Sequence, residues 1–306
     1  MSKKIVFMGT PEFSLQTLKT LSTSEFEIVC VYTQPPKKSD RGQKINKTPI
    51  HTFSEKLNLE VRTPADLLSE DEYQYFKKLN PYIAIVVAYG KIIPKKYLSV
   101  PKKGFLNIHA SLLPKLRGAA PIQRSIMNSE KETGISFMKI EEKLDAGPYM
   151  SQVKVKINSQ TTTQSLSKEL SLIASENIIK CLNLIKNEKA NFISQNLDNV
   201  TYAKKIEKKE SKIIWNDTAQ NILAKINSLN PDPGAWFEYD GVRYKIWRAK
   251  INERSGCPGA VIDEKLIIGC KDKSLEILEI QREGKNKLST NIFLRGKKIS
   301  IGQNIS

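Results

Sequence analysis

The chain has 306 residues, which is enough for two domains, and its 40% hydrophobic content is typical of a folded protein with a core. Its net charge of +17 favours a polyanionic partner, nucleic acid or an acidic membrane surface, although a coding bias toward lysine, asparagine and isoleucine would raise the charge equally. The absence of a signal peptide pattern, of a run near the ~20 apolar residues of a membrane span and of paired cysteine spacing predicts a reduced, cytoplasmic protein without a structural zinc site.

The N-terminal part of the chain alternates short apolar strands with amphipathic helices, the pattern of a parallel sheet covered by helices on both faces. Thr10 and Pro11 predict the start of the first helix, with the threonine as its cap. Strands are expected at residues 4–8, 26–32, 83–88, 105–109, 134–140 and 148–157. Helices are expected at residues 12–21, 49–57, 70–79, 121–127 and 165–185. We therefore expect an α/β domain over residues 1–189.

The character of the sequence then changes. Residues 190–206 are polar and rich in lysine, as is typical of a linker. A helix at 218–229 ends at a proline-rich turn, and short strands follow at hairpin spacing, at residues 235–239, 242–249, 259–262, 266–269 and 275–281. This pattern predicts a small β-barrel domain over residues 207–306.

Three polar residues form the strongest candidate for a reactive site. Asn107 and His109 lie two residues apart near the end of an expected strand, so both side chains leave the same face of the sheet. Asp145 adds a carboxylate on a turn that ends at a glycine. An amide, an imidazole and a carboxylate suit a reaction in which a carbonyl oxygen gains charge while an amine loses a proton.

The segments around these residues predict a ligand crevice but not a dinucleotide. Gly9 lacks the second and third glycines of a dinucleotide-binding loop, which disfavours a nicotinamide or flavin. The apolar run Ser111, Leu112, Leu113 and Pro114 is either packing under a loop or the wall of a pocket for a flat ligand. The run Ala88, Tyr89 and Gly90 suits backbone recognition of a heterocycle. Residues 37–47 form a long basic loop, which is either solvated or grips phosphates.

These motifs resemble those of the methionyl-tRNA formyltransferase family across essentially the whole chain. The residues that carry the resemblance are Phe7-Met8-Gly9-Thr10-Pro11, Val87-Ala88-Tyr89-Gly90, Asn107 to Pro114, Arg117-Gly118-Ala119-Ala120-Pro121 and Leu144-Asp145-Ala146-Gly147. The resemblance implies a Rossmann-like formyltransferase domain followed by an OB-like barrel that binds tRNA. It also implies transfer of a formyl group from 10-formyl-tetrahydrofolate to the amine of methionyl initiator tRNA, by direct attack and without a metal.

The resemblance also implies residue roles. Asn107 and His109 would hydrogen-bond the developing oxyanion, and Asp145 would orient His109 and assist removal of the proton. Folate would lie against Val87, Ala88, Tyr89 and Gly90 and against Ser111, Leu112, Leu113 and Pro114. The tRNA acceptor end would meet the basic loop through Lys38, Arg41, Lys44 and Lys47, where Gln43 stands in place of a second basic residue. Asp232 departs from the aromatic residue that the family tends to carry in its proline-rich turn.

Three other functions remain open from the sequence alone. The acceptor could be a small amine, but such a protein would need neither the basic loop nor the second domain. The chain could instead be an RNA-binding protein on an inactive enzyme fold, which would have no use for Asn107, His109 and Asp145. A folate-dependent hydrolase would leave the positive charge unused. A monomer is the default expectation for the oligomeric state.

Overall fold

The structure is a computed structural model that describes residues 3–39, 44–297 and 299–305, except for the side chains of Lys38, Ser39 and Lys44. The chain divides by its contacts into two compact units. The N-terminal unit comprises residues 1–119, 133–155 and 167–203, and the C-terminal unit comprises residues 120–132, 156–166 and 204–306. The domain limits expected from the sequence, 1–189, 190–206 and 207–306, stay a prediction.

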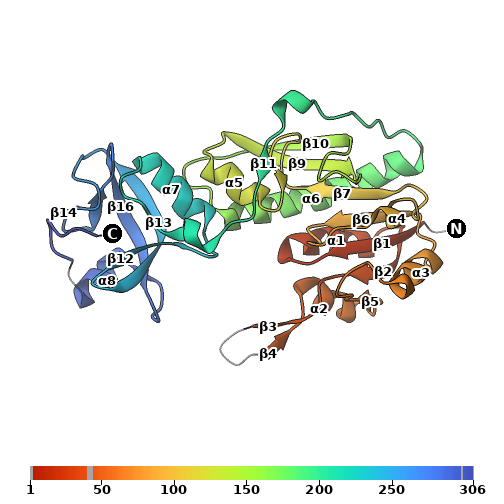
Figure 1. Cartoon of the computed structure of the whole chain (residues 1–306), viewed down its shortest axis with the longest axis horizontal. Coiled ribbons are helices and arrows are strands. Elements are labelled where there is room, and N and C mark those ends of the chain that lie inside the picture. Colours follow the sequence, from red (N-terminus) through yellow and green to blue (C-terminus); the bar gives the residue numbers. More distant parts are fainter. Residues whose placement is uncertain (1–2, 40–43, 298, 306) are drawn as a thin grey trace. The chain divides into compact units, whose positions relative to one another are not determined.

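The N-terminal unit is built on a seven-stranded sheet with helices on both faces (Figure 1). Its strands are β1 (Lys4–Gly9), β2 (Glu27–Tyr32), β5 (Val61–Arg62), β6 (Ile83–Val87), β7 (Phe105–His109), β9 (Glu132–Lys139) and β10 (Tyr149–Lys156), in the order β10-β9-β7-β6-β1-β2-β5. Its helices are η1 (Glu12–Ser14), α1 (Leu15–Ser22), α2 (Pro49–Lys56), α3 (Glu70–Lys78), α4 (Lys95–Leu98), α6 (Thr163–Lys186), which begins in the other unit, and η2 (Leu197–Asn199).

The predicted parallel sheet is confirmed for β5, β2, β1, β6 and β7, while β9 runs antiparallel to β7 and makes the sheet mixed. The side chains of β1 and β6 are almost completely buried, as their continuous apolar sequence predicts. Two short strand pairs stand outside the sheet: β3 (Lys37–Ser39) with β4 (Lys44–Asn46), and β8 (Arg117–Gly118) with β11 (Tyr202–Ala203).

The predicted start of the first helix is wrong in its detail. Pro11 is the cap, a single 3-10 turn (η1) precedes α1, and the hydroxyl of Thr10 donates to the carbonyl oxygen of Tyr89 at 2.8 Å instead of capping the helix. The start of the second helix is as predicted, because α2 begins at Pro49 and Thr48 caps it by accepting a hydrogen bond from the backbone N–H of His51.

The C-terminal unit carries an antiparallel sheet of six strands (Figure 1), in agreement with the helix and short strands at hairpin spacing expected there. The strands are β12 (Ala235–Tyr239), β13 (Val242–Asn252), β14 (Val261–Asp263), β15 (Ile267–Gly269), β16 (Ser274–Arg282) and β17 (Leu288–Ser289). The helices are α5 (Pro121–Met127), η3 (Lys208–Ser211), α7 (Ala219–Ser228) and α8 (Thr290–Gly296). Apolar side chains of α7 and α8 join those of β12, β13 and β16 in one core.

The cysteines are in the thiol form throughout. Cys30, Cys181 and Cys270 are buried, and burial raises the pKa of each to about 12, whereas Cys257 is exposed. In the part of the chain that the structure describes, no helix combines the length and the apolar character that crossing a membrane requires.

An ion pair in the C-terminal unit gives a first testable expectation. Glu210 in η3 accepts two hydrogen bonds from the Arg124 guanidinium of α5, at 2.7 and 2.9 Å, and this contact holds the pKa of the carboxyl below its usual value. Replacing Glu210 with Gln should lower the free energy of unfolding at pH 7 by about 1–2 kcal/mol, because the guanidinium loses its charged partner.

The pH dependence follows from the direction of this pKa shift. A carboxyl whose pKa is lower in the folded state stabilises the fold above its unfolded pKa, near 4.5, and that stabilisation is lost as the pH falls through the folded pKa. Melting curves of the wild type and Glu210→Gln should therefore differ at pH 7 and converge in acid. Glu253→Gln, which removes an exposed ion pair with Lys273, is the control and should change little. An equal shift for both variants would contradict the expectation.

Candidate active site

The last strand of the parallel part of the sheet places two of the three predicted reactive residues. β7 lies between β6 and β9, with Asn107 opposite Val86 and Met138, and His109 opposite Ser136. The flanking residues of β7 are buried, so the strand is fixed on both sides. Among the described residues, no protein group hydrogen-bonds the Asn107 side-chain amide, which leaves its N–H groups available to a ligand.

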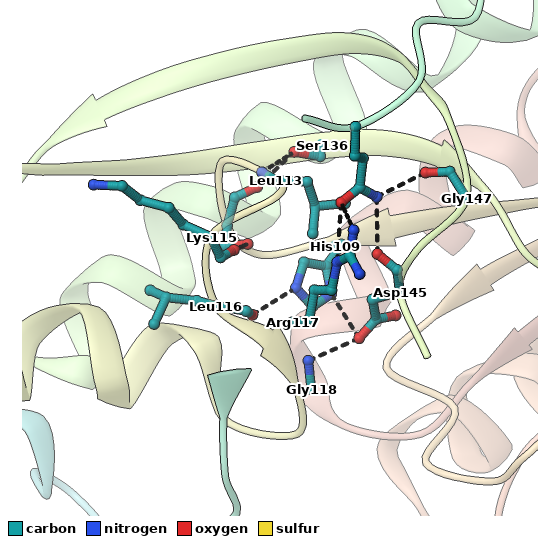
Figure 2. A network of polar contacts seen from close by, with 11 residues as sticks. His109, Leu113, Lys115, Leu116, Arg117, Gly118, Ser136, Asp145 and Gly147 are labelled. Carbon is teal, nitrogen blue, oxygen red and sulfur yellow. Dashed lines mark hydrogen bonds and ion pairs between the residues drawn. The ribbon is translucent and has the colours of Figure 1, made fainter. Parts of the chain in front are cut away.

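His109 is held by a backbone bond on one side and faces Asp145 on the other (Figure 2). Its Nε2 lies 3.0 Å from the carbonyl oxygen of Leu116, which only accepts, so Nε2 carries a proton. Its Nδ1 then points to Oδ2 of Asp145 at 3.7 Å, which is longer than a hydrogen bond. The ring is 6% exposed. A neutral His109 therefore offers Nδ1 as a base, and the carboxylate stands where it stabilises the imidazolium.

The turn that carries Asp145 lies between β9 and β10. Because β9 is antiparallel to β7, Lys139 at the end of β9 lies opposite Leu106, and the loop after it turns back toward His109. Asp145 has a left-handed backbone (φ 46°) and its Oδ2 accepts a bond of 2.8 Å from the N–H of Gly118. The turn is tight: a Cβ on Gly147 would lie 2.0 Å from the Lys139 carbonyl oxygen.

The two predicted folate-binding segments leave neighbouring parallel strands, β6 and β7, at the same edge of the sheet. The loop after β7 is rigid because the Ser136 hydroxyl donates to the Ser111 carbonyl oxygen at 2.6 Å and accepts from the Leu113 N–H at 3.1 Å. Gln152 adds bonds of 2.8 Å to the Leu113 carbonyl oxygen and to Ser136. Leu112 and Pro114 are partly exposed, while Ser111 and Leu113 are buried.

The loop after β6 presents backbone rather than side chains. Val87 is buried and its carbonyl oxygen accepts from Ser14 at 2.6 Å. Ala88 and Gly90 are exposed and have left-handed backbones, with φ of 48° and 78°. The Tyr89 ring is buried, and burial raises the pKa of its hydroxyl far above neutrality, so it takes no part in proton transfer at neutral pH.

The predicted tRNA-binding residues fall on and beside a short hairpin. β3 and β4 pair antiparallel, Lys37–Ser39 with Lys44–Asn46, and extend away from the sheet of this unit (Figure 1). Lys38 and Lys44 are strand residues of the hairpin, and Arg41 lies outside the described residues. Lys47 is half-exposed and pairs with Glu55 at 2.5 Å, which lowers the pKa of that carboxyl. Lys47 is therefore partly neutralised and a weaker phosphate ligand than its charge suggests.

Two protein-family models match the chain. The chain matches the family model described as formyl transferase over residues 3–182, and the model described as formyl transferase, C-terminal domain, over residues 205–298. The chain belongs to the formyl transferase family. The enzyme class that the sequence predicts, a formyl-transferring enzyme, is confirmed by these matches.

Relatives of this formyl transferase match it from end to end. A methionyl-tRNA formyltransferase of Pelagibacter ubique is 52% identical over 308 residues, covering 100% of this chain and 99% of the relative. One of Chelativorans sp. is 40% identical over 311 residues and covers 100% of both chains. The family resemblance recognised in the sequence is thereby confirmed.

Solved structures share the fold at low sequence identity. An N-formyltransferase from Helicobacter canadensis, in complex with folinic acid and dTDP-3-aminofucose, is 19% identical with a TM-score of 0.68, covering 92% of this chain and 100% of that one. The methionyl-tRNA formyltransferase from Clostridium thermocellum is 18% identical with a TM-score of 0.57, covering 82% and 94%. HypX from Aquifex aeolicus with tetrahydrofolic acid is 18% identical with a TM-score of 0.64, and this chain spans about half of its length, 51%.

Two buried residues next to the Asp145 turn are missing from the set predicted as reactive. Arg117 and Gln195 are 5% and 8% exposed and hydrogen-bond each other. Arg117 lies in a motif that carries the family resemblance, so the sequence marked it without giving it a role. Gln195 lies in the stretch expected to be a linker, between the exposed residues Ser194 and Asn196, and no apolar periodicity marks it.

Proposed function

We propose that this formyl transferase moves the formyl group of 10-formyl-tetrahydrofolate to the α-amine of methionyl initiator tRNA and yields formylmethionyl-tRNA for translation initiation. One observation carries the proposal: Asp145 meets His109 beside Asn107, in a chain that is similar over its whole length to relatives named methionyl-tRNA formyltransferase. The expected setting is the cytoplasm, and the expected oligomeric state is a monomer.

The residues give the reaction a sequence of proton transfers. The amine attacks the formyl carbon, and the carbonyl oxygen becomes an oxyanion that the free Asn107 amide hydrogen-bonds. The attacking amine nitrogen loses its proton to Nδ1 of His109, directly or through one water. Nε2 cannot accept it, because Nε2 already carries the proton that it donates to the Leu116 carbonyl oxygen. Asp145 stabilises the imidazolium, whose Nδ1–H then donates to the oxyanion. When the tetrahedral intermediate collapses, the bond between carbon and the folate nitrogen breaks, and that nitrogen takes the proton.

The folate segments fit a flat, partly polar ligand. The side chains of Leu112 and Pro114 offer apolar surface, and the rigid turn held by Ser136 keeps that surface in place. Ala88 and Gly90 are exposed and carry no large side chain, and the Gln34 side chain beside them donates to the carbonyl oxygens of Tyr89 and Gly90. These residues would hold the folate and supply no step of the reaction.

The proposal is tested by mixing the purified protein with methionine-charged initiator tRNA and 10-formyl-tetrahydrofolate, and by measuring formylmethionyl-tRNA by mass. Rapid formylation of the initiator, with little on charged elongator tRNA, supports it. If folate binds but neither tRNA is formylated, the acceptor is a small amine instead. If folate does not bind, 10-formyl-tetrahydrofolate is not the formyl donor and the proposal is wrong.

Binding of the tRNA should weaken steeply with salt. A chain with a net charge of +17 is expected to contact several phosphates, and each contact releases a bound cation. Contact with about four phosphates predicts a loss of affinity of about 10²-fold between about 50 and 200 mM salt. Fluorescence titration at several salt concentrations measures the slope, and circular dichroism at each concentration is the control for folding. An affinity that does not change with salt would rule out binding through phosphate contacts.

A further inference from the structure

Gln195 is a buried amide with all of its hydrogen-bonding groups engaged. Its Oε1 accepts from Nε and Nη2 of Arg117 at 3.0 and 2.7 Å. Its Nε2 donates to the carbonyl oxygens of Asp145 and Gly147 at 2.8 and 2.7 Å. A buried amide with four satisfied bonds has a fixed position, because moving it would leave several polar groups unpaired.

These bonds join the two segments that place the Asp145 carboxylate. One segment is the turn that carries Asp145 and ends at Gly147. The other is β8, where Arg117 binds Gln195 and the next residue, Gly118, donates its N–H to Oδ2 of Asp145 at 2.8 Å. Figure 2 shows both segments meeting beside His109. Gln195 therefore fixes the backbone on either side of the carboxylate without contacting the carboxylate itself.

The neutral side chain of Gln195 binds the charged Arg117 guanidinium without cancelling its charge. Arg117 is 5% exposed, and within the described ranges of the chain no carboxylate lies at ion-pair distance from it. The amide oxygen of Gln195 solvates the guanidinium but leaves its positive charge in place. A carboxylate at this position would neutralise that charge and would also face two carbonyl oxygens, which repel it. Only an amide can both accept from the Arg117 guanidinium and donate to the carbonyl oxygens of Asp145 and Gly147.

Resting on the proposed formyl transfer, we infer that Gln195 is a positioning residue: it ties the Asp145 turn to β8 and thereby holds the Asp145 carboxylate facing Nδ1 of His109. The stretch that contributes it, residues 194–203, is bonded to the segments that hold His109 and Asp145. Thr201 accepts from the Leu116 N–H at 2.9 Å, and β11 pairs with β8. Because Leu116 also binds His109, this stretch supports both members of the His109–Asp145 pair.

A double-mutant cycle tests the inference. Gln195→Met keeps the length and burial of the side chain and removes all four bonds, so it should lower kcat about 10–100-fold, with the KM values for folate and tRNA within about twofold. Gln195→Glu keeps an acceptor for Arg117 but loses both donors, and it should show a loss of similar size. In an Asp145→Asn background, Gln195→Met should lower kcat further by less than about threefold, since its effect acts through Asp145.

A second glutamine of the same unit is the matched control. Gln74 of α3 is exposed, donates to Glu70 at 2.6 Å and is not among the residues assigned to the site, so Gln74→Met should leave kcat and the KM values near those of the wild type. Rates are measured in single-turnover experiments with enzyme in excess and are normalised to the folded fraction by folate-binding stoichiometry. If Gln195→Met does not fold, the cycle is run with Gln195→Glu.

The outcomes separate the inference from the proposed function. Wild-type protein that formylates no tRNA overturns the proposed function, and the inference with it. If the wild type formylates initiator tRNA but the losses of kcat caused by Gln195→Met and Asp145→Asn multiply in the double mutant, only the inference is wrong. A fall in melting temperature and in folate-binding stoichiometry, with normal kcat for the folded fraction, would assign Gln195 a merely structural role.

Discussion

Replacing Asn107 with Ala is expected to lower kcat by about 10²–10³-fold, the usual loss when one donor to an oxyanion is removed. The Asn107 amide lies at the end of a rigid strand and, among the described residues, donates to no protein group. It is therefore free for the charge that develops on the formyl oxygen. The KM values should change little, because the ground-state carbonyl oxygen carries little charge and gains less from the donor.

The control for Asn107 uses a substitution of the same shape. Asn107→Asp keeps the volume but replaces the donor with an oxygen, so it should be at least as inactive as Asn107→Ala. Single-turnover rates with charged initiator tRNA measure the loss, and folate-binding titrations confirm that the site is formed. A rate within about threefold of the wild type for either variant would remove Asn107 from the oxyanion contact, since a true donor is worth far more.

Replacing Asp145 with Asn should lower kcat by about 10²–10⁴-fold, the range seen for loss of a general acid–base partner. The variant keeps the fold because an asparagine oxygen still accepts the hydrogen bond from Gly118. It loses the negative charge 3.7 Å from Nδ1 of His109, and the imidazolium that forms during the reaction is no longer stabilised.

The chain offers a matched control for this prediction in Glu142. This exposed carboxylate lies three residues before Asp145 in the same loop and pairs with Lys95 at 2.5 Å. Glu142→Gln removes the same charge from the same loop and should keep nearly full activity. Equal losses in Glu142→Gln and Asp145→Asn would mean that the net charge of the loop, rather than the contact with His109, supports the reaction.

The sequence predicted the parts of the fold that local patterns determine. The buried strands β1 and β6 appear as continuous apolar runs, and the period of two along β7 places Asn107 and His109 on one face. The strands β3 and β4 were missed because each has only three residues, of which only Ile45 is apolar, too few to show a pattern. Thr10 was assigned to a helix cap because its bond to Tyr89 joins residues far apart in the chain.

The part of the site that the sequence could not predict depends on the paths of loops. The sequence predicts Asp145 on a turn, but its approach to His109 follows from the reversed direction of β9 and the return of the loop after it. Gln195 has no local signal, since its four bonds all reach residues at least 48 positions away. Long-range polar contacts of this kind leave no periodic trace in a single sequence.

The distribution of the cysteines makes the unmodified chain ready for site-specific labelling. Cys30, Cys181 and Cys270 are shielded and remain as thiols up to strongly alkaline pH, so a maleimide dye at neutral pH should attach to Cys257 alone. Cys257 lies in the C-terminal unit just before β14. A single fluorophore there, introduced without any mutation, would report directly whether this unit contacts the tRNA when the nucleic acid is added.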